Sequence, residues 1–322
     1  MAEDWGAAGE GWEAEVEELR RRQALARRMG GPEKLKRQSA AGRPTYDEDG
    51  EVVEFLPANL GFGRGRIDGR LVAVAGDDFT VRGGAADASI WAKNVQAETM
   101  ANQLRLPMVR LIEGTGGGGS VRTIKTTGYT YVPANPAWEQ VVENLETVPV
   151  VALGLGPVAG LGAARMAASH YSVLVEGVSQ MFVAGPPVVK RIGQDLDKEA
   201  LGGAKIHARN GAVDAVADSE DHAFELARRF LSYLPSSVDE LAERAPCDDP
   251  ADRAEERLLR AIPKDRRQVY EIRPILEDVF DRGSVFEIGR AGGKSIVTGL
   301  ARLDGWPVAV IGRRRLTTRT LL

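Results

Sequence analysis

The sequence predicts an α/β fold in which helices cover a largely parallel sheet. Between residues 50 and 235, short apolar runs of strand length alternate with segments whose apolar residues recur at helical spacing. Strands that alternate with helices form crossover units and hence parallel sheets. The chain has 322 residues, of which 43% are hydrophobic and 27% charged, and these values are typical of a folded globular protein.

The first strands and helices follow from apolar runs and their flanking glycines. Residues 71–75 form an apolar run between turn residues and are expected to be a buried strand. Residues 90–104 carry apolar side chains on one helical face. The next strand is expected at 108–113, and the glycines of 114–119 are expected in a flexible loop.

The same alternation continues to the end of this block. The pattern predicts a helix over 138–145, a strand over 149–155, a helix over 159–169 and a strand over 171–175. An amphipathic helix over 224–234 closes the block.

Two polar segments flank the block. Residues 12–38 are highly charged, with leucine and alanine at helical spacing, and are expected to be a helix that packs on a partner surface rather than on nucleic acid. Residues 235–257 are rich in Asp, Glu, Pro and Ser and lack a clear apolar period. We therefore expect a linker between domains, which we place at 236–262.

An internal repeat indicates a duplicated domain. Residues 66–76 recur as residues 302–312 with seven of eleven positions identical. Asp-Gly turns are common, so chance agreement is the alternative explanation. The copies lie on either side of the expected linker, as a duplication would place them. Only residues 313–322 follow the second copy, so we expect a second domain that begins but is not completed.

Charge and cysteine content exclude several classes of protein. A net charge of −4 offers no basic excess for nucleic acid. The single cysteine, Cys247, excludes an intrachain disulfide framework and a multi-cysteine metal site. No secretory signal is visible, and the apolar runs are too short to span a bilayer. We expect a cytoplasmic protein with no metal and no membrane contact.

Two glycine clusters are candidates for ligand binding. Residues 114–119 lack the Gly-Lys-Ser/Thr ending of a nucleotide-triphosphate loop and do not lead directly into a helix. In residues 155–164, a buried strand leads through small residues into a helix, and the amides of Gly160, Leu161 and Gly162 would face developing negative charge. This is how an oxyanion hole is built, although tight packing of helix on strand would explain the same small residues.

Side-chain nucleophiles do not offer a competing mechanism. No serine lies in a Gly-x-Ser-x-Gly pattern, and the three histidines are scattered. His170 and His222 are interpreted as structural or exposed residues. His207, which follows two glycines and an alanine, is the one histidine that we retain as a site candidate.

Five stretches, in order, resemble one enzyme family. They are residues 78–84, 156–160, 181–186, 201–204 with His207, and 231–235. The chain resembles the carboxyltransferase (beta) subunits of biotin-dependent acyl-CoA carboxylases, such as the propionyl-, methylcrotonyl- and acetyl-CoA carboxylases. The resemblance covers roughly residues 12–311.

The resemblance implies a duplicated crotonase/ClpP-like ββα superhelix. We expect a charged helical arm at 1–45, the acyl-CoA domain at 46–235, the linker at 236–262 and the start of the second domain at 263–311. Residues 312–322 differ from the family's continuation, so we expect the second domain to remain incomplete. A frameshift or a premature end of the reading frame would explain this tail.

The resemblance also implies a reaction and its site. In the family, carboxybiotin releases carbon dioxide, an acyl-CoA enolate attacks it, and two oxyanion holes stabilise the enolates. The position that matches the acyl-CoA hole is Gly160-Leu161. Residues implied to contact the substrate are Gly116, Gly117, Ala159, Gly162, Gly185 and His207.

The implied partners follow from this reaction. They are an acyl-CoA, a separate biotin carrier with its biotin carboxylase, and other copies of the chain in a trimer or hexamer, or a complete homologue. Two other functions stay open. The chain could be a non-catalytic subunit that binds acyl-CoA or assembles with a complete homologue, or it could be a crotonase-like acyl-CoA decarboxylase.

Overall fold

A seven-stranded sheet forms the main body of the computed structural model, which describes residues 45–46, 52–54, 59–84, 91–116, 137–265 and 267–313. Its strands are β3 (Leu60–Ile67), β4 (Arg70–Asp77), β5 (Met108–Gly116), β6 (Val150–Gly160), β7 (Tyr171–Val175), β8 (Gln180–Phe182) and β9 (Ala215–Ala217). The order is β3-β4-β5-β6-β7-β9, and β8 also pairs with β6. Only the β3–β4 pair is antiparallel, so the predicted largely parallel sheet is confirmed.

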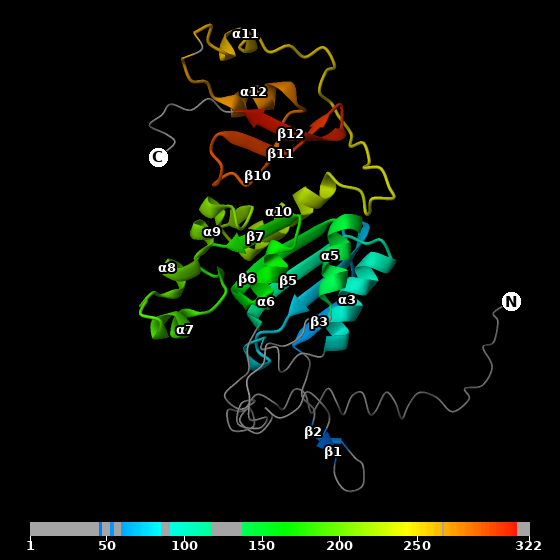
Figure 1. The fold of residues 1–322 in the computed structure, drawn as a ribbon. Helices are drawn as coiled ribbons and strands as arrows, with labels where there is room; N and C mark the ends of the chain where they lie inside the picture. Colours follow the sequence, from blue (N-terminus) through cyan, green and yellow to red (C-terminus); the bar gives the residue numbers. More distant parts are fainter. Residues whose placement is uncertain are drawn as a thin grey trace, which may run out of the picture.

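Helices cover both faces of this sheet (Figure 1). On one face lie α3 (Trp91–Gln103), α5 (Trp138–Thr147) and α6 (Leu161–Ala167), which pack through two apolar clusters. The other face carries α10 (Glu220–Ser232). A short 3-10 helix, η1 (Arg82–Gly84), follows β4, and β8 is followed by α7 (Pro186–Arg191), α8 (Lys198–Gly202) and α9 (Ala204–Asn210).

A smaller antiparallel sheet lies beyond α10 (Figure 1). It consists of β10 (Phe286–Ile288), β11 (Ile296–Leu303) and β12 (Trp306–Arg313), and α12 (Ile272–Val279) packs on it. The other elements are α11 (Leu258–Ala261) and a small pair of strands, β1 (Thr45–Tyr46) and β2 (Val52–Glu54). Phe286 and Leu300 join the apolar cluster under α10, which connects the two sheets.

The repeated sequence forms a repeated hairpin. β3 and β4 turn at Asp68-Gly69, and β11 and β12 turn at Asp304-Gly305, with φ of 50° at both aspartates. In both hairpins the arginine two positions before the aspartate donates to the carbonyl oxygen of the turn glycine. That the second hairpin begins another copy of the domain stays a prediction, as do the domain boundaries.

Most predicted elements of the block are confirmed, and one is wrong in part. Gly114, Thr115 and Gly116 belong to β5 rather than to a loop, because they pair with Val158–Gly160 of β6. The predicted helix at 12–38 lies outside the described residues. Among the residues that the structure describes, no helix has the length and apolar character needed to cross a membrane.

Candidate functional site

The predicted oxyanion hole lies where β6 ends and α6 begins. Gly160 has φ 56° and ψ −117°, a conformation that is open to glycine and strained for a residue with a Cβ atom. α6 begins at Leu161, and no side chain caps its N-terminus. The first amides of a helix have no partner within the helix. The first turn of α6 therefore presents main-chain donors at the end of a buried strand.

Two strands flank this turn. Gly116 of β5 lies opposite Gly160, and Phe182 of β8 lies opposite Ala159, which is buried. The carboxyl ends of parallel strands are where open α/β sheets bind ligands. The structure thus brings the predicted residues Gly116 and Ala159 to the turn, whereas Gly117 lies outside the described residues.

Gly162 is explained by packing. A Cβ atom at this position would lie 3.2 Å from Cγ1 of Val158 and 3.4 Å from Cγ2 of Ile112. The lack of a side chain at Gly162 therefore allows α6 to lie close to β5 and β6. The tight-packing explanation of the glycine cluster therefore applies to Gly162, while the conformation of Gly160 calls for a glycine for a different reason.

Near the end of β5, the backbone of Gly114 lies close to that of Gly84. Gly114 has φ 136°, and a Cβ atom there would lie 2.9 Å from the Cα atom of Gly84. Gly84 belongs to η1 and to the first of the five family-like stretches. Two sequence motifs that are 30 positions apart along the chain therefore meet beside the turn at Gly160.

Gly185 and His207 lie on the β8 side of the turn. Gly185 precedes α7, and a Cβ atom there would lie 3.7 Å from the ring of Phe182. His207, on α9, donates from Nε2 to the carbonyl oxygen of Met181 at 2.5 Å, and its Nδ1 is buried without a partner. The imidazole thus holds β8, and its contact with substrate stays a prediction. The ring of His170 bonds the main chain at Val150 and Leu145, as a structural histidine does.

Charged groups at the same edge of the sheet were missed by sequence reasoning. Asp77 ends β4, and Arg165 of α6 donates to its Oδ1 at 3.1 Å. Glu113 lies near the end of β5 with its carboxylate against Gly156. The signal was available, because Asp77 and Glu113 each follow an apolar run that predicts a strand, and adjacent parallel strands end at one edge.

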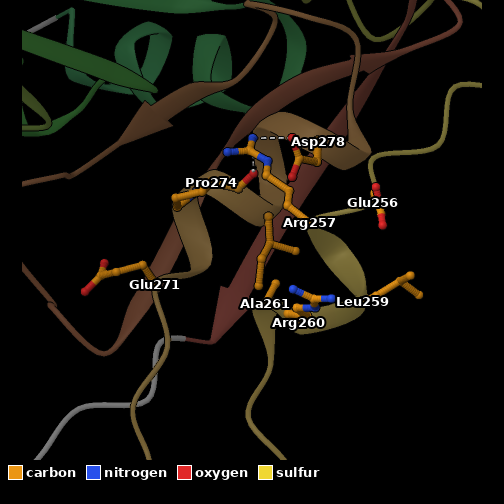
Figure 2. A pocket seen from close by; sticks show the side chains of 9 residues that line it. Glu256, Arg257, Leu259, Arg260, Ala261, Glu271, Pro274 and Asp278 are labelled. Atoms are coloured by element: carbon orange, nitrogen blue, oxygen red, sulfur yellow. Dashed lines mark hydrogen bonds and ion pairs between the residues drawn. The ribbon is translucent and has the colours of Figure 1, made fainter.

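A separate hollow lies between α11 and α12 (Figure 2), with a volume of about 560 Å³. Arg257 donates across it to Asp278 and, at 3.4 Å, to the carbonyl oxygen of Pro274. This charged pair is satisfied within the protein and gives no sign of a ligand. Within the described ranges, no cluster of His, Cys, Asp or Glu could hold a metal ion.

Comparison of the sequence with models of known protein families identifies the family of this chain. The family model of the carboxyl transferase domain matches residues 42–318. The chain belongs to the carboxyl transferase family. The predicted family is therefore confirmed, and with it the membership of an enzyme family.

Relatives of this carboxyl transferase domain include subunits of acyl-CoA carboxylases and the alpha subunit of methylmalonyl-CoA decarboxylase from Veillonella parvula, which is 27% identical over 93% of the chain. The carboxyltransferase subunit of propionyl-CoA carboxylase from Haloferax mediterranei is 29% identical over 96% of the chain. A probable biotin-dependent acyl-coenzyme A carboxylase beta2 subunit from Mycobacterium tuberculosis is 30% identical over 93% of the chain. The chain spans 64% and 60%, respectively, of the length of these two proteins.

A solved structure confirms the crotonase-like α/β fold class. The 12S component of transcarboxylase, solved as a hexamer with hydrolysed methylmalonyl-coenzyme A bound, superimposes with a TM-score of 0.73. It is 25% identical in sequence, and the match covers 95% of this chain and 63% of the transcarboxylase chain.

Proposed function

We propose that this carboxyl transferase domain supplies the acyl-CoA half of a biotin-dependent carboxyltransferase. The observation that supports this is the turn from β6 into α6, where Gly160 takes a conformation suited to glycine and the first amides of α6 have no helical partner. A thioester carbonyl at this turn would accept hydrogen bonds from the amides of Gly160 and Leu161. Membership of the family supports carboxyl transfer as the reaction.

These amides would act on charge that develops during the reaction. Loss of the α-proton moves negative charge onto the carbonyl oxygen of the acyl thioester. Fixed amides that already point to this oxygen stabilise the charge without reorganising. The α-carbon then forms a bond to carbon dioxide, and the carbonyl is restored. Carboxybiotin, on a separate carrier protein, would supply the carbon dioxide, and the biotin that remains after its release would accept the α-proton.

The remaining substrate contacts and the partners belong to the same proposal. The residues that would line the path of the acyl-CoA are Gly116, Gly117, Ala159, Gly162, Gly185 and His207. A biotin carrier, its biotin carboxylase and further copies of the chain would assemble around the site in the cytoplasm. Val183, which directly follows β8, and Ile192, which caps α7, are 89% and 76% exposed, and a protein partner would cover such apolar side chains.

Leu161 allows a direct test of the amide. Leu161→Pro removes one N–H group at the first position of a helix, where proline is tolerated. Leu161→Ala keeps the N–H group and removes the side chain, so it is the matched control. The proline variant should lower turnover about 100- to 1,000-fold. Titration calorimetry should also show that its preference for acyl-CoA over CoA falls by up to about tenfold, while the alanine variant keeps both.

Three assays of the full chain separate the proposed function from its alternatives. Transfer of label from bicarbonate to acyl-CoA, with biotin carboxylase and carrier added, supports carboxyl transfer. Release of carbon dioxide from a carboxylated thioester without transfer would identify a decarboxylase. Binding of acyl-CoA without either reaction would identify a non-catalytic subunit, and no binding of acetyl-, propionyl- or methylcrotonyl-CoA would overturn the proposal.

A further inference from the structure

A buried charged network lies between the sheet and the helices that cover it. Arg110, on β5, holds both carboxylate oxygens of Glu98, on α3, at 2.9 and 2.8 Å. The two side chains are 0% and 3% exposed. Asn144 of α5 donates to the same carboxylate at 2.9 Å. Burial lowers the pKa of Arg110, and the bonds to Glu98 act in the opposite direction by favouring the charged form.

The same guanidinium reaches the C-terminal end of α6. Nη1 of Arg110 donates to the carbonyl oxygen of Ala168, the residue that caps the helix, at 2.5 Å. It also donates to the carbonyl oxygen of Arg165 at 3.2 Å. The last carbonyls of a helix lack partners within it and lie at the negative end of its dipole. A buried cation at this end therefore fixes and stabilises α6.

A second arginine ties α6 to β4. Nη1 of Arg165 lies 3.1 Å from Oδ1 and 3.4 Å from Oδ2 of Asp77, and the two side chains are 12% and 16% exposed. Burial lowers the pKa of Arg165, but the charges of Asp77 and Glu98 outweigh it and the pKa is raised. We call Asp77, Glu98, Arg110 and Arg165 the α6 clamp.

We infer that the α6 clamp positions the main-chain amides at Gly160 and Leu161 against the substrate's carbonyl oxygen. This inference rests on the proposed function of those amides. A helix of seven residues is about 10 Å long, so a shift at its C-terminal end also moves its N-terminal amides. An error of about 1 Å in a catalytic geometry can cost roughly a hundredfold in rate.

The chemistry of the clamp favours positioning over stability. A buried ion pair adds little net stability compared with apolar side chains of the same volume. Its hydrogen bonds have fixed directions, which apolar contacts do not provide. The clamp residues therefore act through α6, as positioning residues.

The test replaces the buried pair as a unit. Glu98→Leu with Arg110→Met leaves no unpaired charge in the interior, so the fold should persist, as circular dichroism would show. The readout is the infrared band of a ¹³C-labelled thioester carbonyl in bound acetyl-CoA, because hydrogen bonds lower its stretching frequency. The double variant should lose most of this shift. Its preference for acetyl-CoA over CoA should also fall by up to about tenfold, equivalent to about 1.4 kcal/mol.

Two further variants control for unspecific effects and for a failure to fold. Arg105→Met with Asp239→Leu removes an exposed pair and should leave the band unchanged. If the double variant does not fold, Arg110→Lys decides, because lysine keeps the charge but cannot hold Glu98 and the helix carbonyls together. An unchanged band in the folded variant would overturn the clamp. If the carbonyl stretching frequency of acetyl-CoA does not fall when it binds the unsubstituted chain, the result would count against the proposed function instead.

Discussion

Glu113 lies near the end of β5, with its carboxylate against Gly156. Partial burial, together with repulsion from Glu220, Asp78 and Asp77, raises the pKa of Glu113 above its ordinary value. The folded chain therefore binds this proton more tightly than the unfolded chain does. It follows that ionisation of Glu113 destabilises the fold.

Stability should consequently depend on pH at this residue. Between the ordinary pKa of a glutamate and the raised value, the free energy of unfolding falls as pH rises, because the folded state binds more protons. Glu113→Gln should remove this fall, so the variant is more stable above that range and gains nothing below it. Urea unfolding at about pH 4 and about pH 8 measures the difference. Exposed Glu139→Gln is the control, and equal pH slopes in the two variants would contradict the prediction.

Arg110 shows why the α6 clamp was not predicted from the sequence. Arg110 lies inside an apolar run, and its sequence neighbours predict only a buried strand. Its partners lie on α3, α5 and α6, and no local spacing relates these helices. Gly160 differs, because the order of strand, small residues and helix is local, and this order predicted the turn.

At the scale of elements, the two hairpins have the same construction. Asp68 and Asp304 both have φ of 50°, which places them in the left-handed region. Each also forms an exposed ion pair, with Arg228 and Arg244 respectively. Exposed pairs of this kind contribute about 0–1 kcal/mol, so conformation should dominate the effect of a substitution.

Twin substitutions can therefore compare the hairpins directly. Asp68→Ala and Asp304→Ala should each lower the free energy of unfolding by about 1–2 kcal/mol, because alanine is strained at positive φ. Asp68→Asn and Asp304→Asn lose the same charge but tolerate this conformation, so they should cost less. Thermal unfolding of the four variants checks this. A large loss in only one hairpin would show that their constructions differ.

Elements with a clear apolar period were predictable from sequence, and the exceptions have physical causes. β7 and α5 follow directly from their local patterns. β5 extends to Gly116 because β6 supplies pairing partners, which a run of glycines does not reveal. η1 was missed because it lies where the backbones of Gly84 and Gly114 come close together. These two residues belong to separate segments of the sequence, so no local pattern reveals their approach.

At the scale of the whole molecule, an aromatic cluster joins the two sheets. Phe286 of β10 is 4% exposed. The centroid of its ring lies 5.3 Å from that of Tyr171 and 6.0 Å from that of Tyr233. The guanidinium of Arg229, on α10, lies over the ring of Phe286 at 5.3 Å. Phe230 stacks on Tyr171 at 4.8 Å. The smaller sheet thus shares a core with the larger one.

Phe286→Ala should weaken this connection. Removal of a buried phenylalanine side chain costs about 3–5 kcal/mol, and the loss should fall on the contact between the sheets. Hydrogen exchange should become faster in β10, β11 and β12 than in β5 and β6. Phe224→Ala, on the exposed side of α10, is the control. Uniformly faster exchange would mean that the two sheets unfold together.

The buried pair of Glu98 and Arg110 also limits how the sequence can change over generations. Loss of either partner alone leaves a charge in the interior, at a cost of about 3–5 kcal/mol. That is a large part of the roughly 5–15 kcal/mol by which a typical domain is stable. Descendants of this sequence should therefore keep both residues or replace both. The two positions, on different elements, would then be inherited as one character.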